Sequence, residues 1–304
     1  MQAIQWQWGI AQWVEYLKDK ELPVLPRTRA VLQALEEGGE EARQRLSARD
    51  LVTIVYADPY LALKLLRRAE ERRTRQLGHD TTTPLAAVLQ TGYDELRTIV
   101  TTSPECTDTL PSCNTCEFRS VLASAIARAW AGRRADISPD EVAMAALLVE
   151  VGELLLWHFA PEMTDKETQV RDWNERFWAL RPRASEIDFT FRQLTMALAQ
   201  SWGLPALVVM LIKGTDTPRA NLPRLAADAA KLITTDPEPA ALLAVLQEVQ
   251  RTTIPGASLE ELAEPLPLPD TIRADLLAAI AAANMAPSTA TEVVPESPPP
   301  PSQE

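Results

Sequence analysis

Residues 137–162 read ISPDEVAMAALLVEVGELLLWHFAPE, and this stretch decides the class of the fold. Ser138 followed by Pro139 is a typical helix start, because a serine side chain can accept from an unpaired amide and proline suits the first helical position. Apolar residues then recur at helical spacing, at Val142, Ala146, Val149 and Leu156. The stretch therefore predicts helix, with two glutamates and a glycine inside an otherwise apolar run.

The same signals recur along the chain and predict an all-α fold. Ser47 and Asp50 form a capping-box pattern, in which a hydroxyl and a carboxylate pair with backbone amides at a helix start. A capping side chain also precedes proline at Asp58-Pro59, Thr83-Pro84 and Asp236-Pro237. There are only 10 glycines and no sustained alternation of Val, Ile and Thr, which argues against sheets.

Composition changes along the chain predict its organisation into two packed helical subdomains. Residues 1–21 contain an apolar stripe that predicts an amphipathic helix docked on the core, and 286–304 are rich in Pro, Ser and Glu, which predicts a disordered tail. The segments expected between these ends are an N-terminal helical subdomain at 22–103, a Cys-containing linker at 104–116, a second helical subdomain at 117–235 and C-terminal helices at 236–285.

The charge of the chain limits its partners. A net charge of −12 and a pI near 4.8 oppose nonspecific binding to nucleic acid or to an anionic membrane. The N-terminus lacks the basic start and apolar core of a signal peptide, and by this reading no apolar run approaches the roughly 20 residues that a bilayer requires. We therefore expect a cytoplasmic protein without nucleic-acid or membrane partners.

The first candidate reactive or metal-binding group consists of three cysteines, Cys106, Cys113 and Cys116. So few exclude the disulfide framework of a small secreted protein. The CxxC spacing suits a redox pair or a metal, yet a closed zinc site needs four ligands and there is no second CxxC. Three readings stay open: loop thiols without a function, a redox-sensitive disulfide, or a metal site.

Three separated segments together resemble the HDOD domain family. The first comprises LPVLPRTRAVLQAL and LSARDLVTIVYADPYLALKLLRRAE at 22–35 and 46–70. The second comprises EFRSVLASAIARAWA at 117–131 and the opening stretch, and the third QLTMALAQSWGLP and ALVVMLIKGTDTP at 193–218. The resemblance implies a helical fold related to HD-type metal phosphohydrolases and a place in bacterial signalling.

The resemblance also indicates which positions of this chain correspond to the metal ligands of that superfamily. They carry Arg119, Val149, Glu150, Phe191, Thr215 and Asp216. Valine and phenylalanine have no lone pair to donate, and arginine stays protonated. The histidines His79 and His158 lie elsewhere, and we expect His79 in a loop and His158 in a structural role at a helix end. Hydrolysis at an HD-type metal centre is therefore not expected.

These substitutions suggest that Arg119 and Glu150 form an ion pair where a metal would hold two helices together. The alternative is that both side chains reach solvent. If they pair, Arg119→Leu should destabilise the fold by a few kcal/mol, and adding Glu150→Leu should restore stability.

The leading functional prediction is a non-catalytic, cofactor-free HDOD-like regulatory module that binds a protein, or alternatively a nucleotide. Common nucleotide-binding, zinc-protease and serine-hydrolase motifs are absent from the sequence. Two other classes stay open: a divergent metal-dependent phosphohydrolase using Glu150 and Asp216, and a cysteine-based redox or metal sensor.

Overall fold

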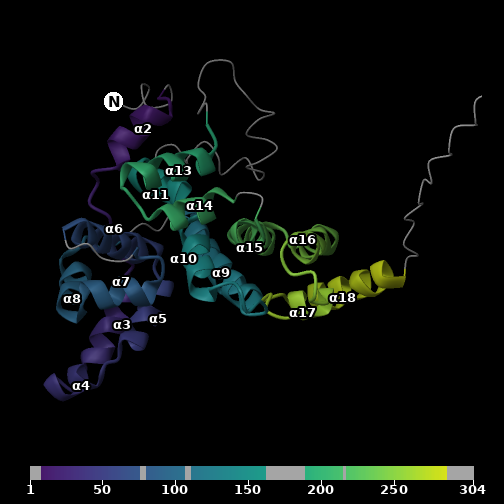
Figure 1. The fold of residues 1–304 in the computed structure, drawn as a ribbon, viewed down its shortest axis with the longest axis horizontal. Coiled ribbons are helices and arrows are strands. Elements are labelled where there is room, and N and C mark those ends of the chain that lie inside the picture. Colours follow the sequence, from purple (N-terminus) through teal and green to yellow (C-terminus); the bar gives the residue numbers. More distant parts are fainter. Residues whose placement is uncertain (1–7, 76–79, 107–110, 162–188, 215–216, 286–304) are drawn as a thin grey trace, which may run out of the picture.

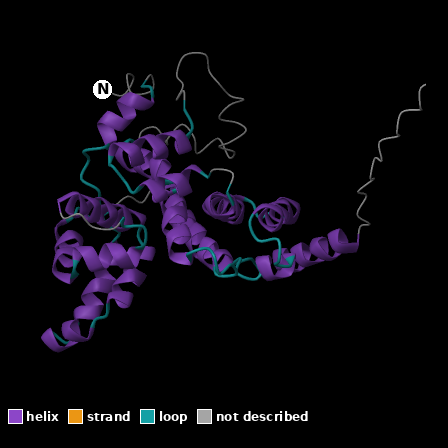
Figure 2. Ribbon diagram, in the orientation of Figure 1, coloured by secondary structure: helices purple, strands orange, loops and turns teal. Residues whose placement is uncertain are grey.

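The computed structural model describes residues 8–75, 80–106, 111–161, 189–214 and 217–285. These residues fold almost entirely into helices, and their only β-type pairing is one parallel bridge between Val24 and Glu105 (Figures 1 and 2). The helices are α2 (Ile10–Leu17), α3 (Pro26–Glu36), α4 (Glu40–Arg45), α5 (Ala48–Tyr56), α6 (Pro59–Arg75), α7 (Pro84–Thr91), α8 (Tyr93–Thr102), α9 (Pro111–Ala131), α10 (Pro139–Leu148), α11 (Val151–Phe159), α13 (Phe191–Ser201), α14 (Ala206–Lys213), α15 (Pro218–Thr235), α16 (Pro239–Thr252), α17 (Leu259–Ala263) and α18 (Asp270–Met285). The predicted all-α class is confirmed.

Most of the predicted helix starts are also confirmed. Helices α6, α7 and α10 begin at three of the four expected prolines, Pro59, Pro84 and Pro139, and Ser47 caps α5 with the predicted reciprocal bonds to Asp50. Asp236-Pro237 is the exception, because α16 begins two residues later, at Pro239 with Glu238 as its N-cap. Pro237 and Pro239 both suit the first position of a helix, so the sequence pattern alone does not predict which of them begins α16.

The cysteine region differs from the expected linker. Helix α9 begins at Pro111, so Cys113 and Cys116 lie in its first turns and only Cys106 precedes it. The expectation that all three cysteines lie in a linker was therefore wrong for two of them. The segment at Cys106 is itself fixed, because its amide donates to Val24 O at 2.8 Å and the amide of Val24 donates to Pro104 O at 2.9 Å.

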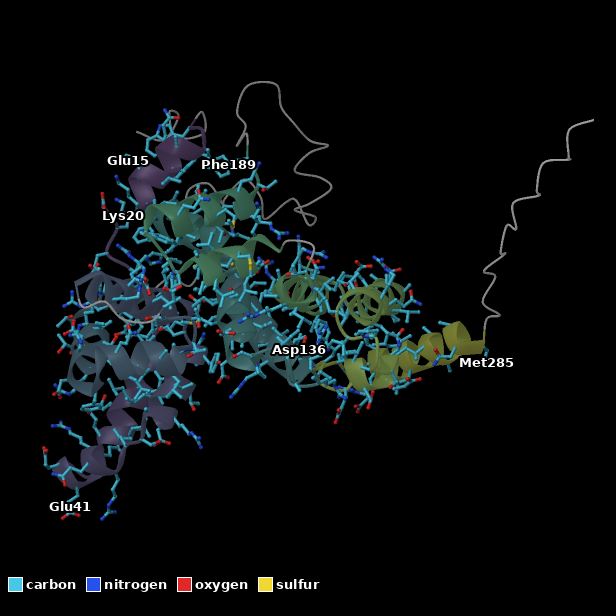
Figure 3. The ribbon with its side chains drawn as sticks, viewed as in Figure 1. Glu15, Lys20, Glu41, Asp136, Phe189 and Met285 are labelled. Atoms are coloured by element: carbon cyan, nitrogen blue, oxygen red, sulfur yellow. The ribbon has the colours of Figure 1, made fainter. Side chains whose placement is uncertain are left out.

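Two hydrophobic cores are present, and α10 contributes to both. The first core joins α2, α3 and α5–α8 to α11, α13 and α14, so it crosses the expected subdomain boundary. The second core joins the later part of α9 to α15–α18. In Figure 1, α3–α8 and α15–α18 lie on opposite sides of α9 and α10. Charged side chains cover the outer faces of both groups (Figure 3).

The helical stretch Pro139–Phe159 is long and apolar enough to cross a membrane by length and composition, with a mean hydropathy of 1.7. The sequence-based statement that no run reaches this length was therefore wrong. In the described part of the chain, 72% of this stretch is buried within the protein, between the two cores. The position of α10 and α11 in the protein interior explains this composition.

The N-terminal helix docks on the first core as predicted. Trp13 and Leu17 are fully buried, and α2 packs on α13. Trp8 and Tyr16 pack edge-on against Trp13, at ring-centroid distances of 5.1 and 5.9 Å. The remainder of the expected 1–21 segment before residue 8, and the expected tail at 286–304, lie outside the described residues.

Candidate functional site

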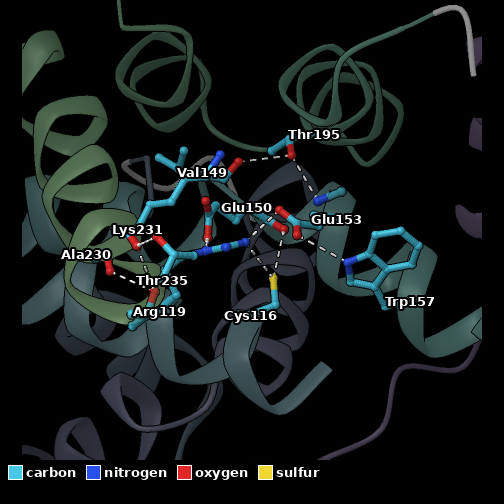
Figure 4. A network of polar contacts seen from close by, with 12 residues as sticks. Cys116, Arg119, Val149, Glu150, Glu153, Trp157, Thr195, Ala230, Lys231 and Thr235 are labelled. Carbon is cyan, nitrogen blue, oxygen red and sulfur yellow. Dashed lines mark hydrogen bonds and ion pairs between the residues drawn. The ribbon is translucent and has the colours of Figure 1, made fainter. Parts of the chain in front are cut away.

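The candidate site lies where α9 faces the junction between α10 and α11 (Figure 4). The two helices of the opening stretch are separated at Val149 and Glu150, and Glu150 is the N-cap residue of α11. A break of this kind releases backbone groups from the helical ladder and changes the direction in which side chains point. It brings Glu150 and Glu153 to the face that meets Arg119 of α9.

Arg119 joins both carboxylates and a thiol. Its Nε donates to Glu150 Oε2, its Nη2 donates to Glu153 Oε2 at 2.7 Å, and Nη2 also lies 3.7 Å from Cys116 Sγ. The three charged side chains are only 6%, 16% and 12% exposed. We call Arg119, Glu150 and Glu153 the ion triad. The predicted Arg119–Glu150 ion pair is thus present, and Glu153 is an additional member.

The charges of the triad explain its protonation. Burial alone would lower the pKa of Arg119, but the Glu153 and Glu150 carboxylates raise it, so the guanidinium stays charged. One cation facing two carboxylates leaves a net negative charge. Burial raises the pKa of Glu150 to about 7, against the attraction of Arg119 and with the repulsion of Glu153. Burial and the second carboxylate therefore favour the protonated form of Glu150, and Arg119 opposes this.

Thr195 of α13 bridges the helix junction. Its hydroxyl donates to Val149 O at 3.0 Å and accepts from the amide of Gly152 at 2.9 Å, so one side chain satisfies groups on both sides of the break. Gly152 is needed for this close approach, since a Cβ atom would lie 2.7 Å from Thr195 N and 2.8 Å from Phe191 O. The close contact between α11 and α13 therefore depends on the absence of a side chain at Gly152.

Two other positions that the resemblance matched to metal ligands, Val149 and Phe191, support the triad through a backbone hydrogen bond and a ring contact. Val149 is at the junction, and its carbonyl is the acceptor for Thr195. The ring of Phe191 packs edge-on against Trp157 at 5.5 Å, and Trp157 Nε1 donates to Glu153 Oε1 at 3.2 Å. Four of the six positions thus lie in or next to the triad. Thr215 and Asp216 lie outside the described residues.

Three groups of metal-ligand type do come together here. Ligand atoms of Cys116, Glu150 and Glu153 lie within 4.8 Å of one another. However, Arg119 donates to one oxygen of each carboxylate and contacts the thiol, so a permanent cation already lies among the three groups and would repel a metal ion there. The residues of this site therefore do not fit a divalent transition metal.

The cysteines are buried thiols with different neighbours. Cys116 contacts the triad, whereas Cys113 contacts Tyr60 and Cys106. Cys106 Sγ also lies 3.7 Å from His158 Nδ1. His158 is in the last turn of α11, as expected, but the contact with Cys106 was not predicted. His79 lies outside the described residues.

Sequence reasoning missed Glu153 and Thr195. Glu153 follows Glu150 by three residues, and this spacing places side chains on one face of a helix, so the signal for a second carboxylate was present. Thr195 gave no such signal, because its role depends on α13 crossing the helix junction. Cys116 likewise precedes Arg119 by three residues on α9.

The fold and the sequence together define the class of this protein. The family model of the HDOD domain matches residues 22–218, so the chain belongs to the HDOD domain family. A virulence factor, cj0248, from Campylobacter jejuni subsp. jejuni has a similar structure, with a TM-score of 0.65 and 16% identity over 88% of this chain and 100% of the other. The MmoQ response regulator from Methylococcus capsulatus str. Bath gives a TM-score of 0.53 and 20% identity over 86% of this chain and 99% of its own. No curated protein matches this chain by sequence.

Proposed function

We propose that this chain is a non-catalytic HDOD module that acts in bacterial signalling by binding a protein partner in the cytoplasm. The observation that carries the proposal is the ion triad: an arginine occupies the junction where the related hydrolases are expected to hold their metal. Since Arg119 cannot generate a metal-bound hydroxide and is already bonded to Glu150 and Glu153, the site serves the packing of α9 against α11. The two proteins of similar structure, a virulence factor and a response regulator, agree with a signalling role.

A groove on the outer side of α9 is the surface we assign to the partner. It has a volume of about 600 Å³ and is lined by residues of α5, α7, α9 and α10, among them Val52, Leu85 and Val121. Leu89 lies one turn from Leu85 on α7 and Phe118 lies one turn from Val121 on α9. These two side chains are 66% and 57% exposed. Exposed apolar side chains beside a groove of mixed apolar and polar lining are typical of protein interfaces.

The charges of the groove favour a protein over a nucleotide. Arg128 would be an evident phosphate ligand, but its Nε lies 3.1 Å from Asp140 Oδ1. The same guanidinium lies 5.2 Å from the centre of the Tyr56 ring, and the Tyr56 hydroxyl donates to Asp140. Arg128 is therefore already compensated, which leaves Arg49 as the single groove arginine without an ion pair among the described residues, beside the apolar side chains that we assign to a protein partner.

Two experiments test the proposal. The full chain should not hydrolyse a bis(nitrophenyl) phosphodiester with added Mn²⁺ or Mg²⁺; metal-dependent turnover that Glu150→Gln abolishes would establish a hydrolase instead. In affinity capture from the source bacterium, Phe118→Ser and Leu89→Ser should each reduce the recovered partner. Leu277→Ser is the matched control, since Leu277 is also exposed but lies on α18. Equal recovery with all three variants would exclude this groove as the binding surface.

A further inference from the structure

Cys106, Cys113 and His158 meet at a second buried site, away from the ion triad. Cys106 comes from the segment before α9, Cys113 from the first turns of α9 and His158 from the last turn of α11. Cys106 is 5% exposed and Cys113 is fully buried. The position of Cys106 is set by the backbone bonds of its segment to Val24, so this thiol is held in place by the fold.

The contacts pair Cys113 with Cys106 and not with Cys116. The Tyr60 hydroxyl lies 3.7 Å from Cys113 Sγ, and the Tyr60 ring packs edge-on against His158, whose Nδ1 lies 3.7 Å from Cys106 Sγ. The Cys106 thiol is also the neighbour that most strongly raises the pKa of Cys113. Cys116 has other neighbours, with its Sγ 3.7 Å from Arg119 Nη2 and 4.0 Å from Glu150 O. The CxxC spacing of the sequence therefore does not identify the thiols that lie together.

The neighbours of Cys106 distinguish the roles of the two thiols. His158 Nδ1 lies 3.7 Å from Cys106 Sγ, so in the tautomer with Nδ1 unprotonated the imidazole can take the thiol proton. The Cys106 thiol, together with burial, raises the pKa of Cys113, which keeps that thiol protonated. The Cys106 thiol also donates to Glu117 Oε1 at 3.7 Å, so an imidazole and a carboxyl group both face it as proton acceptors. Cys106 is thus the thiol with proton acceptors beside it, and Cys113 is the thiol placed to react with it afterwards.

We propose that Cys106 and Cys113 form a disulfide when the protein meets hydrogen peroxide. Cys106 transfers its proton to His158, and the thiolate attacks one peroxide oxygen. The O–O bond breaks, the leaving hydroxide takes the proton from His158 as water, and Cys106 becomes a sulfenic acid. Cys113 then attacks that sulfur, the S–O bond breaks, and the second water leaves with the proton of Cys113. Two thiols are oxidised to one disulfide and peroxide is reduced to two waters.

Burial makes this reaction selective for a small oxidant. Peroxide is uncharged and close to water in size, whereas a glutathione molecule could not reach a thiol that is 5% exposed without local opening. The product would covalently join the segment before α9 to α9 itself, the helix that carries Arg119.

A metal site is the rival use of the same residues, because Glu117 Oε1 lies 3.7 Å from Cys106 Sγ and would complete a set of four donors. The arrangement does not favour it. Among described residues, only Cys116, Glu150 and Glu153 have three ligand atoms all within 4.8 Å of one another. The neighbours of Cys106 are therefore spread around its sulfur and do not face a common centre.

The test uses the full-length wild-type chain, treated with peroxide, blocked with an alkylating reagent under denaturing conditions, and mapped by peptide mass spectrometry. We expect a Cys106–Cys113 disulfide with Cys116 alkylated.

Cys116→Ser should form the same disulfide, and His158→Gln should form it several-fold more slowly. A Cys113–Cys116 disulfide, or three alkylated thiols after treatment that oxidises a model dithiol, would overturn the proposal. Stoichiometric zinc in the purified protein would also overturn the proposal, if Cys106→Ser removes the zinc and Glu150→Gln leaves it bound. Because the pairing is read from wild-type protein, an unfolded variant would not obscure it, and the result is independent of the proposed partner binding.

Discussion

Arg119 Nη2 of α9 and Glu153 Oε2 of α11 lie 2.7 Å apart, with the two side chains 6% and 12% exposed. Together with Glu150 they connect two helices through charge in a place largely removed from solvent. A buried charge that loses its partner destabilises far more than a surface charge does. The ion triad should therefore dominate the response of this region to mutation.

Arg119→Leu should lower the free energy of unfolding by about 3–5 kcal/mol, since it leaves two buried carboxylates unpaired. Arg251→Leu is the matched control, because Arg251 pairs with Glu248 but is 72% exposed, and its loss should cost less than about 1 kcal/mol. Urea unfolding followed by circular dichroism measures both. Equal losses in the two variants would contradict the buried triad.

The rescue of Arg119→Leu should need changes at both glutamates. The sequence-based expectation was that Glu150→Leu would suffice, but Glu153 would still be buried without its cation. Adding Glu150→Leu should therefore recover only part of the lost stability, and adding Glu153→Met as well should recover most of it. Full recovery in the double variant would show that Glu153 does not depend on Arg119.

Gly152→Ala should separate α11 from α13. Its Cβ would lie 2.7–2.8 Å from backbone and hydroxyl atoms of Thr195 and Phe191, and backbone cannot move aside locally. We expect a loss of several kcal/mol, on the scale of severe overpacking. Gly256→Ala is the control, since nothing lies within 4 Å of its Cβ position. Thermal denaturation should show a large drop for the first variant and little change for the second.

Asp58 is a buried carboxylate directly before α6 that accepts several hydrogen bonds in the first core. Its fully buried carboxylate accepts from the amides of Leu25, Tyr60 and Leu61 and from the Thr28 hydroxyl, at 2.6–3.0 Å. Asp58→Ala should cost about 3 kcal/mol, because it combines loss of a cap with unsatisfied buried donors. The exposed capping residue Asp50 provides the comparison: Asp50→Ala should cost about 1 kcal/mol. Denaturant midpoints that fall equally would show that the buried bonds add nothing.

Glu117 should make the protein less stable as pH rises. Burial, and secondarily the Cys106 thiol, raises the pKa of Glu117 to about 8, above the value of 4.5 expected in the unfolded chain. Between these values the folded state binds more protons than the unfolded state, so the free energy of unfolding falls as pH increases from about 4.5 to 8. Glu117→Gln should flatten this part of the profile. Parallel pH profiles of wild type and variant would contradict the raised pKa.

The sequence predicted the helices better than their contacts. Capping patterns such as Ser47 with Asp50 act within a few residues, so local chemistry alone determined where α5 begins. The HDOD resemblance then placed Arg119 opposite Glu150 across a sequence separation of 31 residues. Without it, neither residue carries a local signal for the other.

The cysteine site shows what local reasoning could not supply. Cys106 and His158 are 52 residues apart, and their contact exists because α11 ends beside the segment that pairs with Val24. The CxxC spacing suggested Cys113 with Cys116, whereas the tertiary fold gives those thiols different neighbours. Side-chain contacts set by the packing of distant helices need the structure.

The most direct test of the central claim is the metal content of the purified full-length protein, measured by plasma mass spectrometry beside thermal-shift scans with Mn²⁺, Mg²⁺, Zn²⁺ and Fe²⁺. If Arg119 is the cation that holds α9 and α11 together, no transition metal should be present in stoichiometric amount, and none of the four ions should raise the melting temperature. A stoichiometric transition metal that Glu150→Gln removes, with a matching thermal shift, would contradict the account.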